Sequence, residues 1–364
     1  MRTRGLALAL AALAALGCRS SSPGPAPAAP AGGAGTATSP APVAGSDSHD
    51  HHVHLLSAGL IRDWKALGAS FSRPDSAYLS ADALLGPPAG DPAARPPVDR
   101  AVLVSMAHLY GHPEFRAGLA LTPDEERLRA AAENDHVALQ AARYPGSAVA
   151  FCSVSALRPH ALAELTRCRR EHGVGGIKLH LANSGIDLRE ASHLAAVAAL
   201  ADFALAERVP ILLHLDPQLR GHTVADVAHF ARIVLAPRPE LTVIVAHLGG
   251  SGGYGAWTRS VFATLREWLA ERAANGAPAP RIWFDLSAVL LERESEGVPA
   301  TSPEEAARLG ADLRDFGFER LLFGSDAPVF HPDDTARLLV ERAGLTPAEV
   351  AELRARTIPG LFAD

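Results

Sequence analysis

Residues 47–56 read DSHDHHVHLL and place four histidines within six positions, directly before two leucines. Side chains of a β-strand alternate between its two faces, so His52 and His54 would point the same way, and Asp50 shares their parity. The stretch is therefore either a solvated, metal-scavenging tail or the first strand of a functional site. Only residues further along the chain separate these two interpretations.

Seven further short apolar runs follow this stretch, and longer segments with helical periodicity separate them. Near-continuous apolar runs are typical of strands buried on both faces. Strands are predicted at residues 100–106, 148–154, 176–181, 209–215, 241–248, 281–287 and 320–324, and helices at 122–143, 159–171, 189–207, 223–235, 257–274, 302–316 and 346–356. Residues 59–97 predict a long first crossover. Eight strands alternating with helices indicate a closed (β/α)8 TIM barrel, and a doubly wound open sheet is the rival because alternation does not reveal closure.

The N-terminal segment predicts export. In residues 1–17, Arg2 and Arg4 precede an apolar run too short to span a bilayer, as in a signal peptide. Cys18 follows a small residue, which resembles the lipidation site of bacterial lipoproteins, with ordinary secretion as the alternative. The rest of residues 18–46 is rich in Pro, Ala and Gly and has little to bury, so we expect a disordered tether. Residues 47–364 are then predicted to be one folded domain. We expect the protein to be secreted or to face the periplasm at the bacterial cell envelope, with membrane contact only through the lipid anchor.

Composition excludes some classes of partner. The net charge of −6 shows no basic footprint, so we expect no nucleic-acid partner. Three cysteines are too few for a disulfide framework. Cys152 and Cys168 could pair in an oxidising compartment, but nothing in their spacing requires it, so we expect two free buried thiols. The sequence does not indicate which oligomeric state the protein adopts.

Polar residues gather where the predicted strands end. His214 closes the run ILLH, His247 lies in VIVAHLGG, and Asp326 follows LLFGS. Lys178 and His180 share one face of GIKLHL. In a barrel these carboxyl ends form one rim where catalytic groups collect, and neutral imidazole and carboxylate are ligands of cations such as Zn²⁺. Each residue alone has a structural explanation, such as a hydrogen-bonded core histidine, but together they predict a metal site at the rim.

These motifs, together with HxH at 52 and 54, resemble the amidohydrolase superfamily of metal-dependent TIM-barrel hydrolases. The similarity is greatest to its amidohydrolase-related (amidohydrolase 2) branch, which also holds decarboxylases and lactonases, and it covers residue 47 to the C-terminus. It implies a ligand set for one divalent metal, which we expect to be zinc: His52, His54, His214 and Asp326. The tail interpretation of the opening stretch is then set aside, and His49 and His51 are bystanders.

The resemblance also implies roles for these residues. A bound cation lowers the pKa of a water from about 15.7 to roughly 7. Asp326 is expected to take the water's proton and return it to the leaving group. His247 is expected to polarise the substrate carbonyl or orient the water, or else to be a fifth ligand or an outer partner. Lys178 could be carboxylated and bridge two metals, could bind a substrate carboxylate, or could form a salt bridge inside the mouth of the barrel. We favour a site with one metal, in which Lys178 is not carboxylated. His180 is expected to contact substrate.

Further polar residues are candidates on the same rim. Asp285 and Ser287 share a parity in WFDLSAV and could contact substrate or orient a ligand imidazole, with structural hydrogen bonding as the alternative. His108 and His112 follow the second strand and lie either on the rim or at the surface.

The predicted function is hydrolysis of a C–N or C–O bond in a small amide, lactone or ester by metal-activated water. The first alternative is non-oxidative decarboxylation of an unsaturated or aromatic carboxylic acid on the same metal. The second alternative is a catalytically dead, lipid-anchored metal-binding barrel.

Overall fold

The computed structural model describes residues 47–86, 96–216, 221–295 and 298–362. The expected signal peptide, Cys18 and the tether therefore lie outside the described residues. In the described part of the chain, no helix is both long and apolar enough to cross a membrane.

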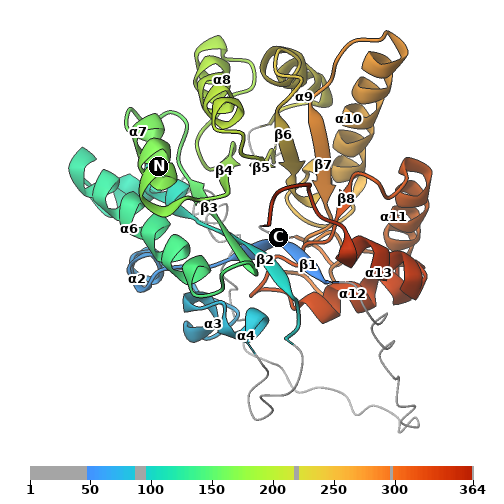
Figure 1. Cartoon of the computed structure of the whole chain (residues 1–364), viewed down its shortest axis with the longest axis horizontal. Coiled ribbons are helices and arrows are strands. Elements are labelled where there is room, and N and C mark those ends of the chain that lie inside the picture. The colour runs from blue at the N-terminus through green and yellow to red at the C-terminus, as the bar shows by residue number, and fades with distance from the viewer. Residues whose placement is uncertain (1–46, 87–95, 217–220, 296–297, 363–364) are drawn as a thin grey trace, which may run out of the picture.

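Eight parallel strands follow one another in chain order around a single sheet (Figure 1). The sheet closes on itself because Phe323 O accepts a hydrogen bond from His51 N–H and His52 O accepts one from Asp326 N–H, each with a donor–acceptor distance of 2.9 Å. The (β/α)8 barrel is confirmed, and the open sheet was the wrong alternative. The strands are β1 (His49–His54), β2 (Arg100–Val104), β3 (Ala148–Ser153), β4 (Gly176–His180), β5 (Ile211–His214), β6 (Thr242–Val245), β7 (Arg281–Asp285) and β8 (Leu321–Leu322).

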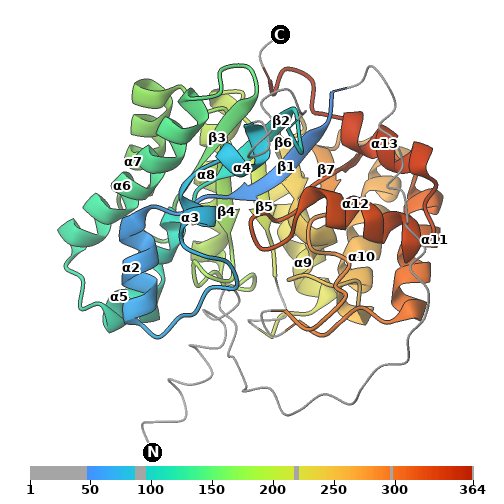
Figure 2. The same cartoon turned by 90° about the horizontal axis from the view of Figure 1, so that it is seen from below.

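Helices surround this sheet, with α2 and α5 to α7 on one side and α10 to α13 on the other (Figure 2). Capping boxes at Thr122, Ser302 and Thr346 begin α6, α11 and α13. The described part of the expected crossover contains three short helices, and α5 and α12 were not predicted. The helices are α2 (Ala58–Ala66), α3 (Ser76–Leu79), α4 (Asp82–Leu85), α5 (Pro113–Gly118), α6 (Pro123–Ala142), α7 (Ala161–Arg167), α8 (Ala191–Ala206), α9 (Val224–Phe230), α10 (Ala256–Ala274), α11 (Pro303–Phe316), α12 (Pro332–Glu341) and α13 (Pro347–Ala355), with short turns η2 (Ala107–Gly111), η3 (Cys168–His172), η5 (Ala231–Leu235) and η6 (Ala246–Gly249).

The interior of the barrel is a packed core, not a pore. Phe151 fills its middle opposite Gly176, where an added Cβ would lie 2.3 Å from the phenyl ring. Three C-terminal residues, Ile358, Leu361 and Phe362, belong to the same cluster. The other fully buried members come from the strands and the turn after β6: Val102, Val104, Phe151, Leu212, Ile244, Ala246 and Leu322. The C-terminal segment therefore packs against the barrel core, and polar chemistry is confined to the carboxyl ends of the strands.

A disulfide joins Cys152 of β3 to Cys168 at the start of η3, with the two Cα atoms 6.6 Å apart. The expectation of two free thiols was wrong. Cys152 faces outward from β3, in the apolar layer beneath the helices, and Cys168 is buried in the same layer. The 16-residue spacing did not reveal the pairing, because it depends on how α7 and η3 fold back against the strand.

Candidate metal centre

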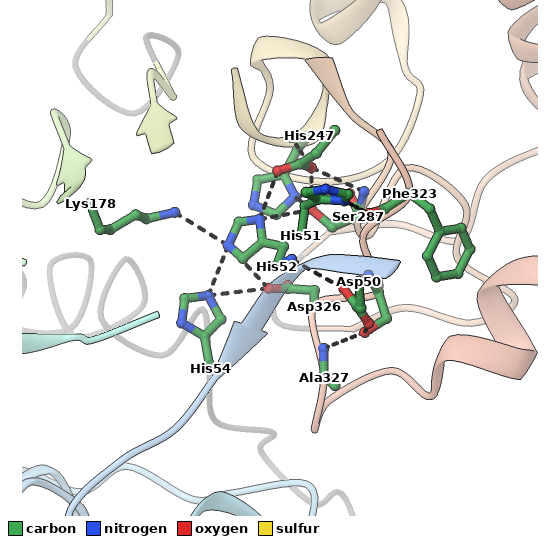
Figure 3. A network of polar contacts seen from close by, with 12 residues as sticks. Asp50, His51, His52, His54, Lys178, His247, Ser287, Phe323, Asp326 and Ala327 are labelled. Carbon is green, nitrogen blue, oxygen red and sulfur yellow. Dashed lines mark hydrogen bonds and ion pairs between the residues drawn. The ribbon is translucent and has the colours of Figure 1, made fainter. Parts of the chain in front are cut away.

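The histidine strand and the loop after β8 bring three donor atoms together (Figure 3). His52 Nε2 lies 3.1 Å from His54 Nε2 and 3.7 Å from Asp326 Oδ1, and the last two atoms are 3.2 Å apart. Gly324 makes this approach possible, since a Cβ there would lie 3.2 Å from the Cβ of His52 and 3.1 Å from that of Ser287. Two histidines of β1 and an aspartate more than 270 residues later thus share one small space.

His247 enters this cluster from the end of β6. Its ring stacks on that of His52, with centroids 4.9 Å apart. The backbone of His247 has a φ of 52°, a left-handed conformation that is uncommon for residues other than glycine and recurs at functional sites. One ligand atom from each of His52, His247 and Asp326 lies within 4.8 Å of the others, which is close enough for a shared cation.

Residues of β7 and the turn after it orient two of these imidazoles. Asp285 Oδ2 lies 2.9 Å from His52 Nδ1, so that nitrogen carries the hydrogen and Nε2 keeps its lone pair. The Ser287 carbonyl oxygen accepts from His247 Nδ1 at 2.8 Å, which leaves the lone pair of His247 on Nε2 as well. Asp285 Oδ1 also accepts the backbone N–H of His247 at 3.0 Å. Both imidazoles therefore present an unprotonated nitrogen.

Asp50 is a buried residue to which the sequence analysis assigned no role. Its Oδ1 accepts backbone N–H groups of His52 at 3.1 Å and Ser325 at 3.0 Å, so it links β1 to the loop that carries Asp326. Burial raises its pKa to about 6, while the hydrogen bonds from Ser325 and His52 oppose the rise. The sequence feature that could have indicated a role for Asp50 is its even spacing from His52 and His54.

The electrostatics of the cluster suit a cation. Burial lowers the pKa of His52 to about 3, so the imidazole is neutral at pH 7. Burial would raise the pKa of Asp326, but the adjacent His54 and the imidazoles of His52 and His247 hold it well below its usual range. Neutral imidazoles beside an ionised carboxylate are the protonation states that metal binding requires.

Several buried donor atoms of this cluster also lack a hydrogen bond. Among the described residues, His54 Nδ1, His214 Nε2 and Asp326 Oδ1 have no hydrogen-bond partner. An unsatisfied buried polar atom costs free energy unless a ligand completes it. The residues present therefore fit a bound divalent cation.

β4 and β5 form the opposite side of the barrel mouth, which is the opening at the carboxyl ends of the strands. The His214 ring stacks on His180 with centroids 3.9 Å apart, and it lies 4.7 Å from the His247 ring. Lys178 is fully buried, and its Nζ lies 3.3 Å from His52 Nε2. Burial lowers the pKa of Lys178 to about 8. The structure thus places His214 beside His247. The three possible metal-ligand atoms that lie nearest to one another come instead from β1 and from the loop after β8.

The two bystander histidines of β1 have partners elsewhere. His51 Nδ1 lies 3.0 Å from Phe323 O and its Nε2 lies 3.1 Å from Thr357 Oγ1. His49 Nδ1 lies 3.1 Å from Arg354 O. His112 caps the start of α5 and is half-buried, whereas His108 is fully buried. These contacts separate the structural histidines from those of the mouth.

Comparison with known proteins identifies the family of the chain. The Amidohydrolase family model matches residues 50–356. The fold resembles a protein from Staphylococcus aureus described as an amidohydrolase, at 15% identity over 84% of this chain and 96% of that chain, with a TM-score of 0.52. It also resembles the 5-carboxyvanillate decarboxylase of Novosphingobium aromaticivorans with bound manganese, at 17% identity over 85% and 95% of the two chains, with a TM-score of 0.51.

The 5-carboxyvanillate decarboxylase of Sphingomonas paucimobilis is 12% identical over 85% of this chain and 97% of its own, with a TM-score of 0.50. At such identities a likeness shows the fold alone. No curated protein matches the chain. The family model nevertheless spans most of the chain and includes every residue of the cluster. The chain therefore belongs to the amidohydrolase family, in its amidohydrolase-related (amidohydrolase 2) branch.

Proposed function

We propose that this protein is a metal-dependent hydrolase that cleaves a C–N or C–O bond of a small amide, lactone or ester. The observation that carries the proposal is the convergence of His52, His247 and Asp326 within 4.8 Å, with His54 Nε2 only 3.2 Å from Asp326. Buried imidazoles with fixed tautomers beside an ionised carboxylate are a set of ligand groups suited to binding a cation.

We further propose that one divalent cation is held by four residues: His52, His54, His214 and Asp326. Zinc is the cation we favour, since imidazole nitrogen and carboxylate oxygen are its usual ligands. Manganese is the alternative, because the Novosphingobium enzyme holds it. When bound, the cation would supply an acidified water and polarise the scissile carbonyl. Two cations are expected only if Lys178 is carboxylated.

The residues of the chain then divide the remaining work. Asp326, whose Oδ1 has no hydrogen-bond partner, accepts the proton of the attacking water and returns it to the leaving nitrogen or oxygen. His247 presents Nε2 to the substrate, because Ser287 O holds its other nitrogen. Asp285 keeps His52 in the tautomer that a ligand needs. This arrangement performs hydrolysis without a covalent intermediate on the protein.

A second candidate is non-oxidative decarboxylation of an unsaturated or aromatic acid. The observation that favours it is Lys178, a fully buried ammonium with no ion pair within 4.0 Å among the described residues. A substrate carboxylate would supply that partner. Both reactions use the same donor set, so the choice between them depends on the product.

Elemental analysis of the purified full chain, followed by a substrate panel, tests these proposals. One equivalent of zinc and hydrolysis of an amide, lactone or ester is the expected result. Release of CO₂ from an aromatic or unsaturated acid, with no hydrolysis, would replace the leading reaction by the second. Full metal loading with no turnover on either class would point to a catalytically dead barrel, and absence of bound metal would refute the metal centre.

We also propose that the protein is exported and tethered through Cys18. The Cys152–Cys168 disulfide supports export, since such bonds persist mainly in oxidising compartments. The test is cell fractionation of the native chain and of Cys18→Ser. Membrane association that disappears in the variant supports the tether, and a cytoplasmic location of the native chain would refute export.

A further inference from the structure

A buried histidine in the turn after β2 has no part in the chemistry proposed above. His108 in η2 is fully buried, and its Nδ1 lies 2.7 Å from Ser153 Oγ. Its Nε2 is buried and has no hydrogen-bond partner in the part of the chain that the structure describes. An imidazole nitrogen left in this state costs free energy unless a ligand binds it.

The orientation of His108 is set by a chain of hydrogen bonds behind it. Ser153 ends β3 with the same parity as the interior residue Phe151, and it pairs in register with Lys178. Asn134 of α6 accepts Ser153 N–H at 2.9 Å and donates to Ser153 O at 3.1 Å. The same Asn134 amide donates to Glu164 of α7 at 2.9 Å. Such support is typical of a preorganised binding residue.

The neighbours of His108 present hydrogen-bond donors. Its ring centroid lies 5.2 Å from that of His180, and it interacts electrostatically with Lys178. His180 Nδ1 accepts the backbone N–H of Asn183 at 3.3 Å, so the hydrogen of His180 is on Nε2. Buried Asp50 and Asp285 and the partly buried Asp326 come from β1, β7 and the β8 loop, and a further buried carboxylate, Asp216, follows β5 and contacts Ser251. The groups gathered around His108 itself, from β4, are thus a lysine and an imidazole N–H.

Binding of a cation would leave Lys178 without its present partner. Lys178 Nζ donates to His52 Nε2 at 3.3 Å, and Asp285 binds the other nitrogen of that ring. A cation on His52 Nε2 would use the same lone pair and would repel the ammonium group. Lys178 would then need a negatively charged partner on the side away from Asp326. In Figure 3, Lys178 approaches His52 from the side opposite Ser287 and Asp50.

We propose that His108, Lys178 and His180 form a subsite for a carboxylate group of the substrate. This inference rests on the proposed function and narrows it to substrates that are acids. Lys178 pairs with the carboxylate, while His108 and His180 each donate from Nε2. The Ser153 hydroxyl donates to His108 Nδ1, which keeps the hydrogen of His108 on Nε2.

Two substitutions at His108 separate this role from a structural one. His108→Asn keeps a hydrogen-bonding group near the position of Nδ1, where Ser153 binds, and removes the one at Nε2. His108→Gln does the reverse. A subsite residue therefore tolerates Gln better than Asn, whereas a residue that only supports Ser153 tolerates Asn better.

The experiment is calorimetric titration of the metal-loaded full chain with butyrate and benzoate, each matched with its neutral alcohol, 1-butanol or benzyl alcohol, which has no bond to hydrolyse. Wild type is expected to bind at least one carboxylate about tenfold tighter than its alcohol, the scale of one charged hydrogen bond. His108→Asn is expected to lose about tenfold in carboxylate affinity, His108→Gln about twofold, and metal content is expected to stay equal in all three proteins.

Other outcomes overturn the subsite. These are equal binding of acid and alcohol by wild type, an Asn variant that binds carboxylate as tightly as wild type does, or a Gln variant whose carboxylate affinity falls as far as that of the Asn variant. If wild type holds metal and turns over a substrate in any of these cases, the proposed function stands and only the subsite fails. If wild type takes up no metal, the proposed function itself fails.

Discussion

β1 uses neighbouring histidines in opposite ways. Toward the base of the barrel, His51 has both ring nitrogens bound within the protein, to Phe323 O and Thr357 Oγ1. Toward the mouth, His52 and His54 face each other and Asp326 across 3.1 to 3.7 Å. The base lies against apolar residues of the C-terminal segment, whereas the mouth collects donors from several strands.

This difference shows how to tell a structural histidine from a binding one. Burial is equal at the two sites, since His51 and His52 are both fully buried. What differs is the kind of partner: the His51 nitrogens contact a backbone carbonyl and a hydroxyl, whereas His52 Nε2 faces the side chains of Lys178 and His54. A ring bound by a carbonyl and a hydroxyl stabilises the fold, and a ring whose neutral Nε2 lies beside an ionised carboxylate and another imidazole is available to a cation.

The largest effect is expected for His52→Ala. Removing this imidazole deletes one donor and leaves Asp285 without its partner, so metal content should fall to near zero and turnover by about 10³-fold or more. Metal analysis and steady-state kinetics measure both. The matched variant is His51→Ala, one position away, which should keep its full metal content while losing about 1–3 kcal/mol of stability. Loss of metal from both variants alike would break the comparison.

Asp326→Asn should separate metal binding from chemistry. The amide keeps one oxygen donor but cannot accept the proton of the water, so we expect partial metal retention and a drop in kcat of about 10² to 10³-fold. Elemental analysis alongside kcat is the measurement. Turnover close to that of wild type would remove Asp326 from its proposed role.

Asp285→Asn probes the residue behind His52. Losing the carboxylate weakens control of the His52 tautomer, and metal affinity should decrease by about 10- to 100-fold. Competition with a chelator of known affinity measures the change. An unchanged affinity would mean that Asp285 serves the fold and not the cluster.

Phe362→Ala tests the other end of the barrel. Truncating this buried ring in the base core should cost about 3 kcal/mol of stability and leave metal content unchanged. Leu162→Ala, at an exposed leucine, is the control and should change stability by less than about 0.5 kcal/mol. Denaturant unfolding measures both variants, and metal loss from Phe362→Ala would show that the two ends are coupled.

The smallest effect on the metal centre is expected for Glu133→Gln. This substitution tests a buried carboxyl group, outside the metal centre, that has one oxygen without a hydrogen-bond partner. Glu133 is fully buried with Oε1 unpartnered, and burial raises its pKa from 4.5 to about 7. The folded state thus keeps a proton that the unfolded state releases, so its contribution to stability is present below pH 4.5 and is lost as pH rises to about 7.

The loss amounts to at most about 3 kcal/mol. Glu133→Gln should therefore flatten the decline in stability between pH 4.5 and 7 and be more stable than wild type at pH 8. Melting temperatures across this range, with the exposed Glu271→Gln as control, are the measurement. An unchanged pH profile would show that Glu133 does not keep its proton.

Much of the fold could be predicted because strand and helix periodicities are local properties. The apolar runs around Phe151, Ile244 and Phe284 all became strands of the barrel, within one to three residues of their expected ends. The disulfide could not be predicted, since Cys152 and Cys168 meet only after α7 packs on β3. Asp50 lacked an assigned role for the same reason, as its partner Ser325 lies 275 residues away.

By itself, the sequence determined the order of the strands and helices and the positions of polar residues at strand ends, because alternation and parity act between near neighbours. The tertiary structure alone decided which histidines meet. Closure of β8 onto β1 brought Asp326 to His52 and His54, and the left-handed turn at His247 directed a fourth donor to the same place. Distances between segments far apart in the chain depend on the packing of the whole barrel, which no local pattern encodes.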